Sequence, residues 1–137
     1  TLIWLRQLNK YMAIFSDFNT SFAVHPVKKD ISLKTDVDAV KQSVRNLILT
    51  DKGERLMQPN VGCKVRSLLF ENISAQTILL VKTTITDTIT QYEPRAIVEN
   101  VKVSADPDNN NLNVSVLFSL INSSTVEQLD LILERIR

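Results

Sequence analysis

Apolar and polar residues follow two different periods along this chain, and the change between them predicts where helices end and strands begin. Apolar residues recur every three or four positions over residues 1–18, 35–50 and 74–92, which is the spacing of one face of a helix. After residue 95 they alternate with polar residues instead, which is the spacing of a strand with one buried face. Helices followed by strands predict an α+β fold.

The first helical pattern, residues 1–18, carries unusually large side chains on one face: Trp4, Leu8, Tyr11, Phe15 and Phe18. Burying each such group would contribute about 1.5–3 kcal/mol, so the predicted helix needs a surface to cover it. Either its own domain or a bundle of partner helices could supply that surface. Residues 19–34 are richer in polar groups and include His25-Pro26, so we interpret them as an extended connector.

Two main helices are predicted in the domain that follows, residues 35–137. The first ends near Gly53, a residue suited to a left-handed terminator. Ser74 is a plausible N-cap for the second, which must stop at Pro94. Between them, a short helix tucked into the core is predicted around residues 65–70.

Strands are predicted from residue 101 onward. Residues 101–105 and 112–120 alternate cleanly around an Asp/Asn-rich turn, which indicates an antiparallel hairpin. The last segment fits a strand through Leu129, Leu131 and Leu133, although a helical spacing also fits, and we interpret it as a strand. The fold class is therefore an N-terminal helix, then two main helices packed on a small antiparallel sheet of about three or more strands.

Composition narrows the class of function. The chain has 137 residues, 44% of them hydrophobic, which suits one domain with a real core. The net charge is +1, with five basic and two acidic groups in residues 1–35 against five basic and eight acidic groups in residues 72–137. Such a mild asymmetry indicates neither a nucleic-acid surface nor a membrane-binding patch.

Candidate chemistry is sparse. Glu54, Glu71 and Glu93 could act as paired carboxylates, and Cys63 with His25 could act as nucleophile and base, but none has a recognisable flanking motif. The single cysteine and single histidine indicate no metal site, and two glycines leave no phosphate-binding loop. We expect no catalytic residue and no cofactor.

Glu93-Pro94-Arg95 stands at the change from helical to strand spacing, where the proline fixes the geometry of two opposite charges. A carboxylate beside an arginine should stay ionised, which suits an ion pair better than a general acid. The tripeptide could be a helix terminator with solvated charges, or a pair buried against another subunit.

Several motifs follow one another in order: residues 38–50 (DAVKQSVRNLILT), Gly53-Glu54-Arg55, a Pro59 to Gly62 turn, Leu68-Leu69-Phe70-Glu71 and Tyr92-Glu93-Pro94-Arg95. Together they resemble the baseplate wedge proteins of contractile phage tails. This sheath-initiator family, sometimes called lysozyme-like, also has relatives in type VI secretion baseplates. The similarity covers roughly residues 17–137, and it departs from the family at Leu56-Met57, where a Pro-Phe pair is usual.

The resemblance implies a non-enzymatic virion protein of the tail baseplate, present in six copies around the tail tube. It implies a fold similar to the sheath interlocking domain, to which the sheath protein adds strands, here at Leu129, Leu131 and Leu133. It also places Glu93, Pro94 and Arg95 near the helical core bundle of other wedge proteins, which the helix bearing Trp4, Leu8, Tyr11 and Phe15 could join. Arg95→Ala would then leave the domain folded but stop tail assembly.

Two other functions remain open at this point. The family's lysozyme-like label and the three glutamates suggest a peptidoglycan hydrolase. The same helix and edge strand would also suit a free-standing oligomeric adaptor.

Overall fold

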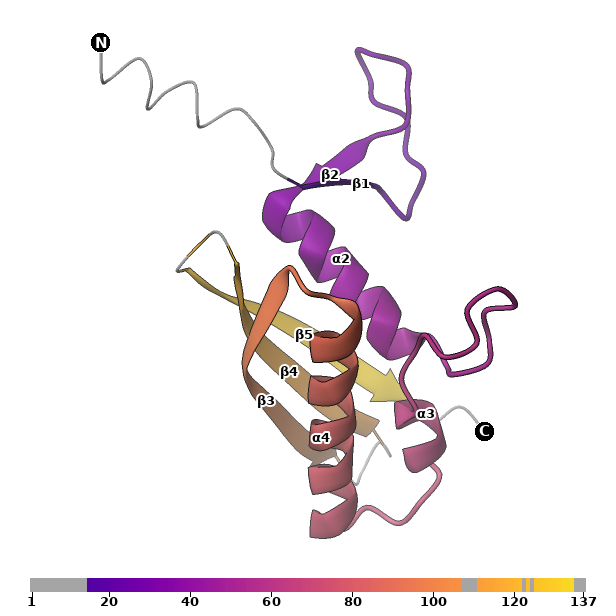
Figure 1. Ribbon diagram of the computed structural model, residues 1–137, viewed down its shortest axis with the longest axis vertical. Coiled ribbons are helices and arrows are strands. Elements are labelled where there is room, and N and C mark those ends of the chain that lie inside the picture. Colours follow the sequence, from indigo (N-terminus) through magenta and orange to yellow (C-terminus); the bar gives the residue numbers. More distant parts are fainter. Residues whose placement is uncertain (1–14, 107–110, 122, 124, 135–137) are drawn as a thin grey trace. The chain divides into compact units, whose positions relative to one another are not determined.

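The computed structural model describes residues 15–106, 111–121, 123 and 125–134, and it divides the chain into two compact units, residues 1–42 and 43–137. The boundary falls within a helix. In chain order the elements are β1 (Ser16–Phe18), β2 (Leu33–Thr35), α2 (Asp36–Leu49), α3 (Val65–Leu68), α4 (Ala75–Tyr92), β3 (Ala96–Asp106), β4 (Asn111–Leu120) and β5 (Val126–Glu134) (Figure 1).

In the first unit, β1 and β2 form a small antiparallel hairpin that precedes the first half of α2. Ser16 pairs with Thr35 and Phe18 with Leu33, and a further bridge joins Val24 to Ile31. The helix predicted through Phe18 is therefore wrong at its end, because pairing with β2 draws these residues into a strand. Residues 19–34, predicted as an extended connector, fold back on themselves. Trp4, Leu8 and Tyr11 lie outside the described residues.

The second unit contains the predicted antiparallel sheet, with strand order β3-β4-β5. Val101 pairs with Val116, and Val114 pairs with Leu131 in turn, so apolar residues of all three strands share one face. A bulge interrupts the β3 register between Val98 and Asn100. The final segment is a strand, as predicted, and the α+β fold class is confirmed.

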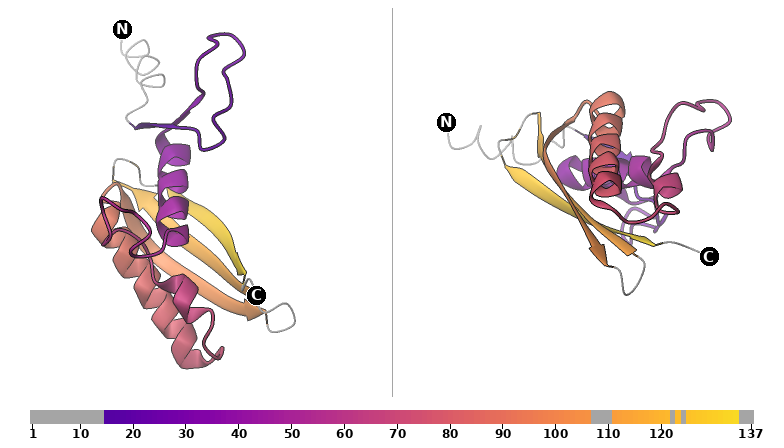
Figure 2. Two further views of the ribbon diagram at one scale, coloured as in Figure 1. Left: turned by 90° about the vertical axis from the view of Figure 1, so that its right-hand side faces the viewer. Right: turned by 90° about the horizontal axis from the view of Figure 1, so that it is seen from below.

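Helices lie on the apolar face of this sheet. Helix α4 packs on β3 and α3 packs on α4, while the part of α2 after Ser43 lies on the same side as α4 (Figures 1 and 2). The most deeply buried large side chains of the unit come from α2, α3 with the residue Cys63 before it, α4 and the sheet: Val44, Cys63, Val65, Val81, Ile85, Ile89, Val101, Val114, Val116 and Phe118. The helical spacing seen in the sequence is thus the spacing of this core.

Two details of the helical region differ from expectation. Helix α2 ends at Leu49, and although Gly53 has a φ of +92°, its N–H donates to Pro59 O at 2.7 Å and closes the following loop instead of capping the helix. Val65 in α3 and Leu69 just after it are buried as predicted, but Phe70 is 55% exposed. One turn of helix cannot turn all its apolar side chains toward the same core.

Helix α4 is rich in threonine and begins at an N-terminal cap. Thr83, Thr84, Thr86 and Thr88 each donate their hydroxyl to the carbonyl four residues earlier, an arrangement that slightly weakens a helix. At the start of the helix the Ser74 hydroxyl accepts the backbone N–H of Thr77 at 3.2 Å, as predicted for an N-cap.

Ser74→Ala should lower the free energy of unfolding by about 1 kcal/mol, because it leaves the Thr77 N–H without its acceptor. Ser74→Asp, which retains an acceptor at the helix N-terminus, is the matched control and should stay near the wild-type value. Urea unfolding followed by circular dichroism measures both. Equal losses in the two variants would contradict a capping role.

Candidate functional site

Glu93-Pro94-Arg95 forms the corner between α4 and β3. The Glu93 N–H continues the helix by donating to Ile89 O at 2.8 Å, and the Ala96 N–H closes a four-residue turn on Glu93 O at 3.1 Å. Pro94 occupies the second position of that turn, where its fixed φ is favourable. Arg95 O then accepts the N–H of Ile121 at 3.1 Å, which ties the corner to the end of β4.

Within this corner the two charges form a two-pronged ion pair. Arg95 Nε lies 2.6 Å from Glu93 Oε1, and the Arg95 Nη2 donor lies 2.8 Å from Glu93 Oε2. The Ser43 hydroxyl, on α2, also donates to Glu93 Oε2. The Glu93 side chain is 4% exposed and that of Arg95 is 26% exposed, so one carboxylate joins the second half of α2, the end of α4 and the start of β3.

Electrostatics favour the ionised form of Glu93. Burial acts to raise the pKa of Glu93, but hydrogen bonds from Arg95 and Ser43 and the positive charge of Arg95 oppose it and together lower the pKa. The carboxylate is therefore a permanent anion at neutral pH. The predicted ion pair is present, and a single chain is enough to bury Glu93; no partner subunit is needed for that.

The other candidate catalytic groups are not arranged for chemistry. Glu54 is exposed and its Oε2 accepts the N–H of Asp51 at 3.0 Å, and Glu71 is exposed. Cys63 is buried, and burial raises the pKa of its thiol, which disfavours a nucleophilic thiolate. His25 Nδ1 accepts the N–H groups of Val27 and Lys28, both at 3.3 Å, and so serves a local turn.

The described part of the chain contains no cluster of three residues that could hold a metal ion. Across those same residues, no helix is both long and apolar enough to cross a membrane.

The second candidate site is the edge of the sheet at β5. Among the described strands β5 pairs with β4 alone, so its other edge is unpaired. Leu131 and Leu133 are only 5% and 6% exposed, and Leu129 is half-buried. The three predicted leucines therefore face the core and hold the strand in place, while the unpaired backbone edge is the part open to a partner.

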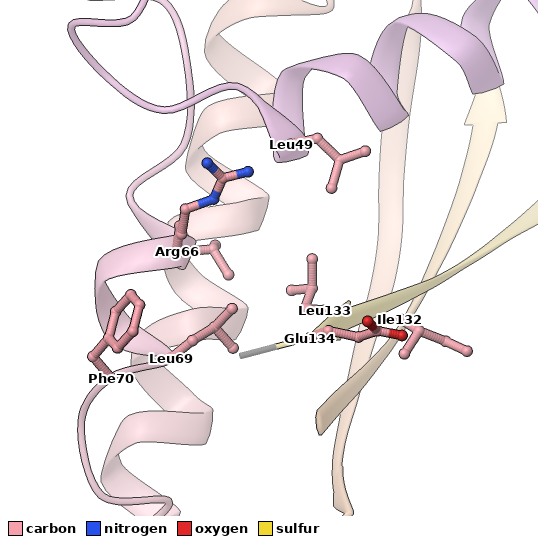
Figure 3. Close-up of a pocket in the computed structure, with 8 residues that line it drawn as sticks. Leu49, Arg66, Leu69, Phe70, Ile132, Leu133 and Glu134 are labelled. Carbon is pink, nitrogen blue, oxygen red and sulfur yellow. The ribbon is translucent and has the colours of Figure 1, made fainter. Parts of the chain in front are cut away.

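A largely apolar groove of about 470 Å³ lies beside the C-terminal end of β5. Leu49 enters it from the end of α2, Leu69 from the residue after α3, and Leu133 from β5 (Figure 3). We call this the β5 groove, and its lining is Leu49, Val65, Arg66, Leu69, Phe70, Ile132, Leu133 and Glu134.

Sequence reasoning missed both Ser43 and the β5 groove. Ser43 lies fifty residues from Glu93, and nothing local marks it as a ligand of that carboxylate. The groove did leave a signal: Ile132 stands at a position of β5 where alternation predicts a polar residue, and it is 64% exposed. Ile132 thus adds an exposed apolar side chain to the lining of the groove.

Two comparisons with known proteins both match a baseplate wedge protein. The family model of baseplate wedge protein gp25 matches residues 34–125. Baseplate wedge protein gp25 of Enterobacteria phage T4 is 34% identical over 106 residues, which cover 75% of this chain and 79% of the phage protein.

Two solved structures share the fold. A tail lysozyme, so assigned, from Geobacter sulfurreducens has a TM-score of 0.71 at 21% identity, covering 77% of this chain and 96% of that one. A chain of the anti-feeding prophage baseplate has a TM-score of 0.62 at 24% identity, covering 90% of this chain and 87% of that one.

Proposed function

The chain belongs to the baseplate wedge protein gp25 family, and we propose that, as a structural subunit of a contractile-tail baseplate, it templates the first ring of sheath subunits. The observation that carries the proposal is the unpaired edge of β5 in a domain of this family. An extended segment of the sheath protein would add to that edge as a further strand.

Strand addition suits β5 for physical reasons. Backbone N–H and C=O groups along an unpaired edge form hydrogen bonds with any extended chain of matching length, and alternating side chains then set the register. Leu131 and Leu133, buried in the core, anchor β5 so that the edge is rigid before the partner arrives. A rigid edge lowers the entropic cost of binding.

We also propose contacts between this chain and other baseplate proteins. We place six copies around the tail tube, with Glu93-Pro94-Arg95 near the helical core bundle of the wedge. Pro94 is exposed and Arg95 partly so, which leaves an outer surface of the corner for that contact. Trp4, Leu8, Tyr11 and Phe15 would join the same bundle.

The proposal is non-enzymatic. Its support is the state of the candidate groups: the Glu93 carboxylate is ion-paired, its pKa is lowered, and the Cys63 thiol is buried with a raised pKa. A general acid near neutral pH requires the opposite shift of a carboxyl pKa. The rigid corner contributes to assembly through shape and not through proton transfer.

Proline substitution in β5 tests the proposal. Neighbouring residues of a strand direct their N–H groups to opposite edges. One of Gln128→Pro and Leu129→Pro therefore removes a hydrogen bond to β4, and the other removes an N–H donor from the free edge. The free-edge variant should be the more stable of the two and yet yield baseplates without sheath. Thermal unfolding identifies that variant, and electron microscopy of particles assembled with it scores the sheath.

The informative comparison is between the two proline variants in the same assembly experiment. Sheaths of normal length on particles that contain the stably folded variant would contradict templating by β5. Absence of baseplates as well as sheaths would place the defect in baseplate assembly, before sheath growth. That outcome would equally count against the proposal.

A further inference from the structure

The β5 groove reaches around the free edge of its strand. Ile132 and Leu133 are consecutive, so their side chains lie on opposite faces of the sheet, with exposures of 64% and 6%. Both line the same groove. A cavity that is lined from both faces of an edge strand opens where the next strand of the sheet would lie.

That position determines what kind of side chain the groove would receive. An added strand would run about 4.8 Å from β5, and its core-side residues would lie next to Leu133. Figure 3 shows Leu49, Leu69 and Leu133 turned toward the same space from α2, the end of α3 and β5. The space is walled by aliphatic side chains, so a core-side apolar residue of the added strand fits it.

The exposed face of β5 carries negative charge. Residues 126–134 contain Glu127, Asp130 and Glu134 and no basic residue. Asp130 and Glu134 share the exposed face, because an even spacing along a strand keeps one side. The nearby Arg66 is already paired with Asp51, at 3.3 Å. An added strand with basic residues on this face would place opposite charges side by side.

We infer that the β5 groove binds an extended segment of a partner protein in which apolar residues facing Leu133 alternate with lysine or arginine residues facing Asp130 and Glu134. The inference rests on the proposed strand addition and specifies the pattern of the added strand. The apolar positions supply affinity and the basic positions select the partner and its register.

Three synthetic peptides test this pattern on the full chain. One alternates valine with lysine, the second alternates threonine with lysine, and the third alternates valine with glutamate. Valine and threonine are close in shape, so the second peptide removes only the apolar character, and the third reverses only the charge. Backbone amide shifts in nuclear magnetic resonance spectra report where each peptide binds, and titration gives its affinity.

We expect the valine–lysine peptide to shift the amides of β5 and of Leu49 and Leu69, and the other two peptides to bind at least about tenfold more weakly. Leu49→Glu and Glu134→Lys should each weaken the first peptide about tenfold. Leu79→Glu on α4 and Glu71→Lys are matched controls, since both residues are exposed and neither lines the groove. They should leave the affinity unchanged.

Shifts confined to other surfaces, or equal affinity for all three peptides, would overturn the inference. So would equal effects of the groove and control variants. Failure here is separable from failure of the proposed function: the peptides need no sheath or baseplate, whereas the proline variants are scored by sheath growth. A chain that templates sheath but ignores the peptide pattern would keep the function and lose the inferred specificity.

Discussion

Arg95→Ala should lower the free energy of unfolding by about 3 kcal/mol at neutral pH. The Glu93 carboxylate is 4% exposed and takes both prongs of the Arg95 guanidinium. Without Arg95 its charge stays buried, with the Ser43 hydroxyl still donating a hydrogen bond to it. Because solvent reaches part of Arg95, the expected loss is at the lower end of the range for broken buried pairs. Urea unfolding at neutral pH measures it.

The loss should depend on pH in a defined direction. In the wild type the pKa of Glu93 is lowered by folding, so the ion pair stabilises the protein above the ordinary carboxyl pKa and ceases to do so as the pH falls through the folded pKa. The stability gap between wild type and Arg95→Ala should therefore narrow in acid, where a neutral Glu93 no longer needs a counter-charge.

Two further variants separate the effect of the charge of Arg95 from the effect of its two-pronged geometry. Adding Glu93→Gln to Arg95→Ala removes the stranded charge, and the double variant should be more stable than Arg95→Ala alone. Arg95→Lys retains the charge but loses the two-pronged geometry, so its free energy of unfolding should lie between those of the wild type and Arg95→Ala. A gap that stays constant from neutral to acid pH would show that Arg95 acts through packing.

The ion pair of Arg95 with Glu93 bears on how an assembly defect of Arg95→Ala is interpreted. The sequence alone suggested that Arg95→Ala would leave the domain folded and stop assembly. Because the side chain neutralises a buried carboxylate of its own chain, an assembly defect in that variant reflects lost stability unless the folded fraction is measured alongside. Exposed Pro94 is the better position for testing a docking contact.

The parts of the fold that sequence patterns predicted are those governed by local rules. Ser74 caps α4 because the interaction spans three residues, and the β3–β4 hairpin follows from alternation around a turn. The helical spacing of Val81, Ile85 and Ile89 appears directly as a stripe with 0% exposure. Each of these predictions depends only on residues that are close together in the sequence.

The parts that escaped prediction depend on segments far apart in the sequence. Phe18 fits a helical spacing, yet it lies in a strand because Leu33 pairs with it, and the chain has no local signal for that partner. The Ser43 contact to Glu93 and the convergence of Leu49 with Leu133 are of the same kind. The candidate corner was visible in sequence, while its closure by α2 was not.

Gly62→Ala should lower the free energy of unfolding by about 3 kcal/mol, because the loop between α2 and α3 leaves no room for a side chain there. A Cβ at position 62 would lie 2.6 Å from Thr50 O and 2.9 Å from the Asp51 carbonyl carbon, both backbone atoms. The φ of +137° adds backbone strain. Thr50 O also accepts the N–H of Cys63 at 2.8 Å, so the crowded carbonyl is the one that closes the loop.

Gly53→Ala is the matched control. Its φ of +92° is also unfavourable for alanine, but a Cβ there meets nothing within 4 Å, so we expect a loss of about 1 kcal/mol. The loop sets the position of α3 relative to the end of α2, and thereby one wall of the β5 groove. Amide shifts at Leu49 and Val65 in Gly62→Ala, absent in Gly53→Ala, should accompany the larger loss. Equal stability of the two variants would mean that the Thr50 carbonyl moves aside and that the groove wall is adaptable.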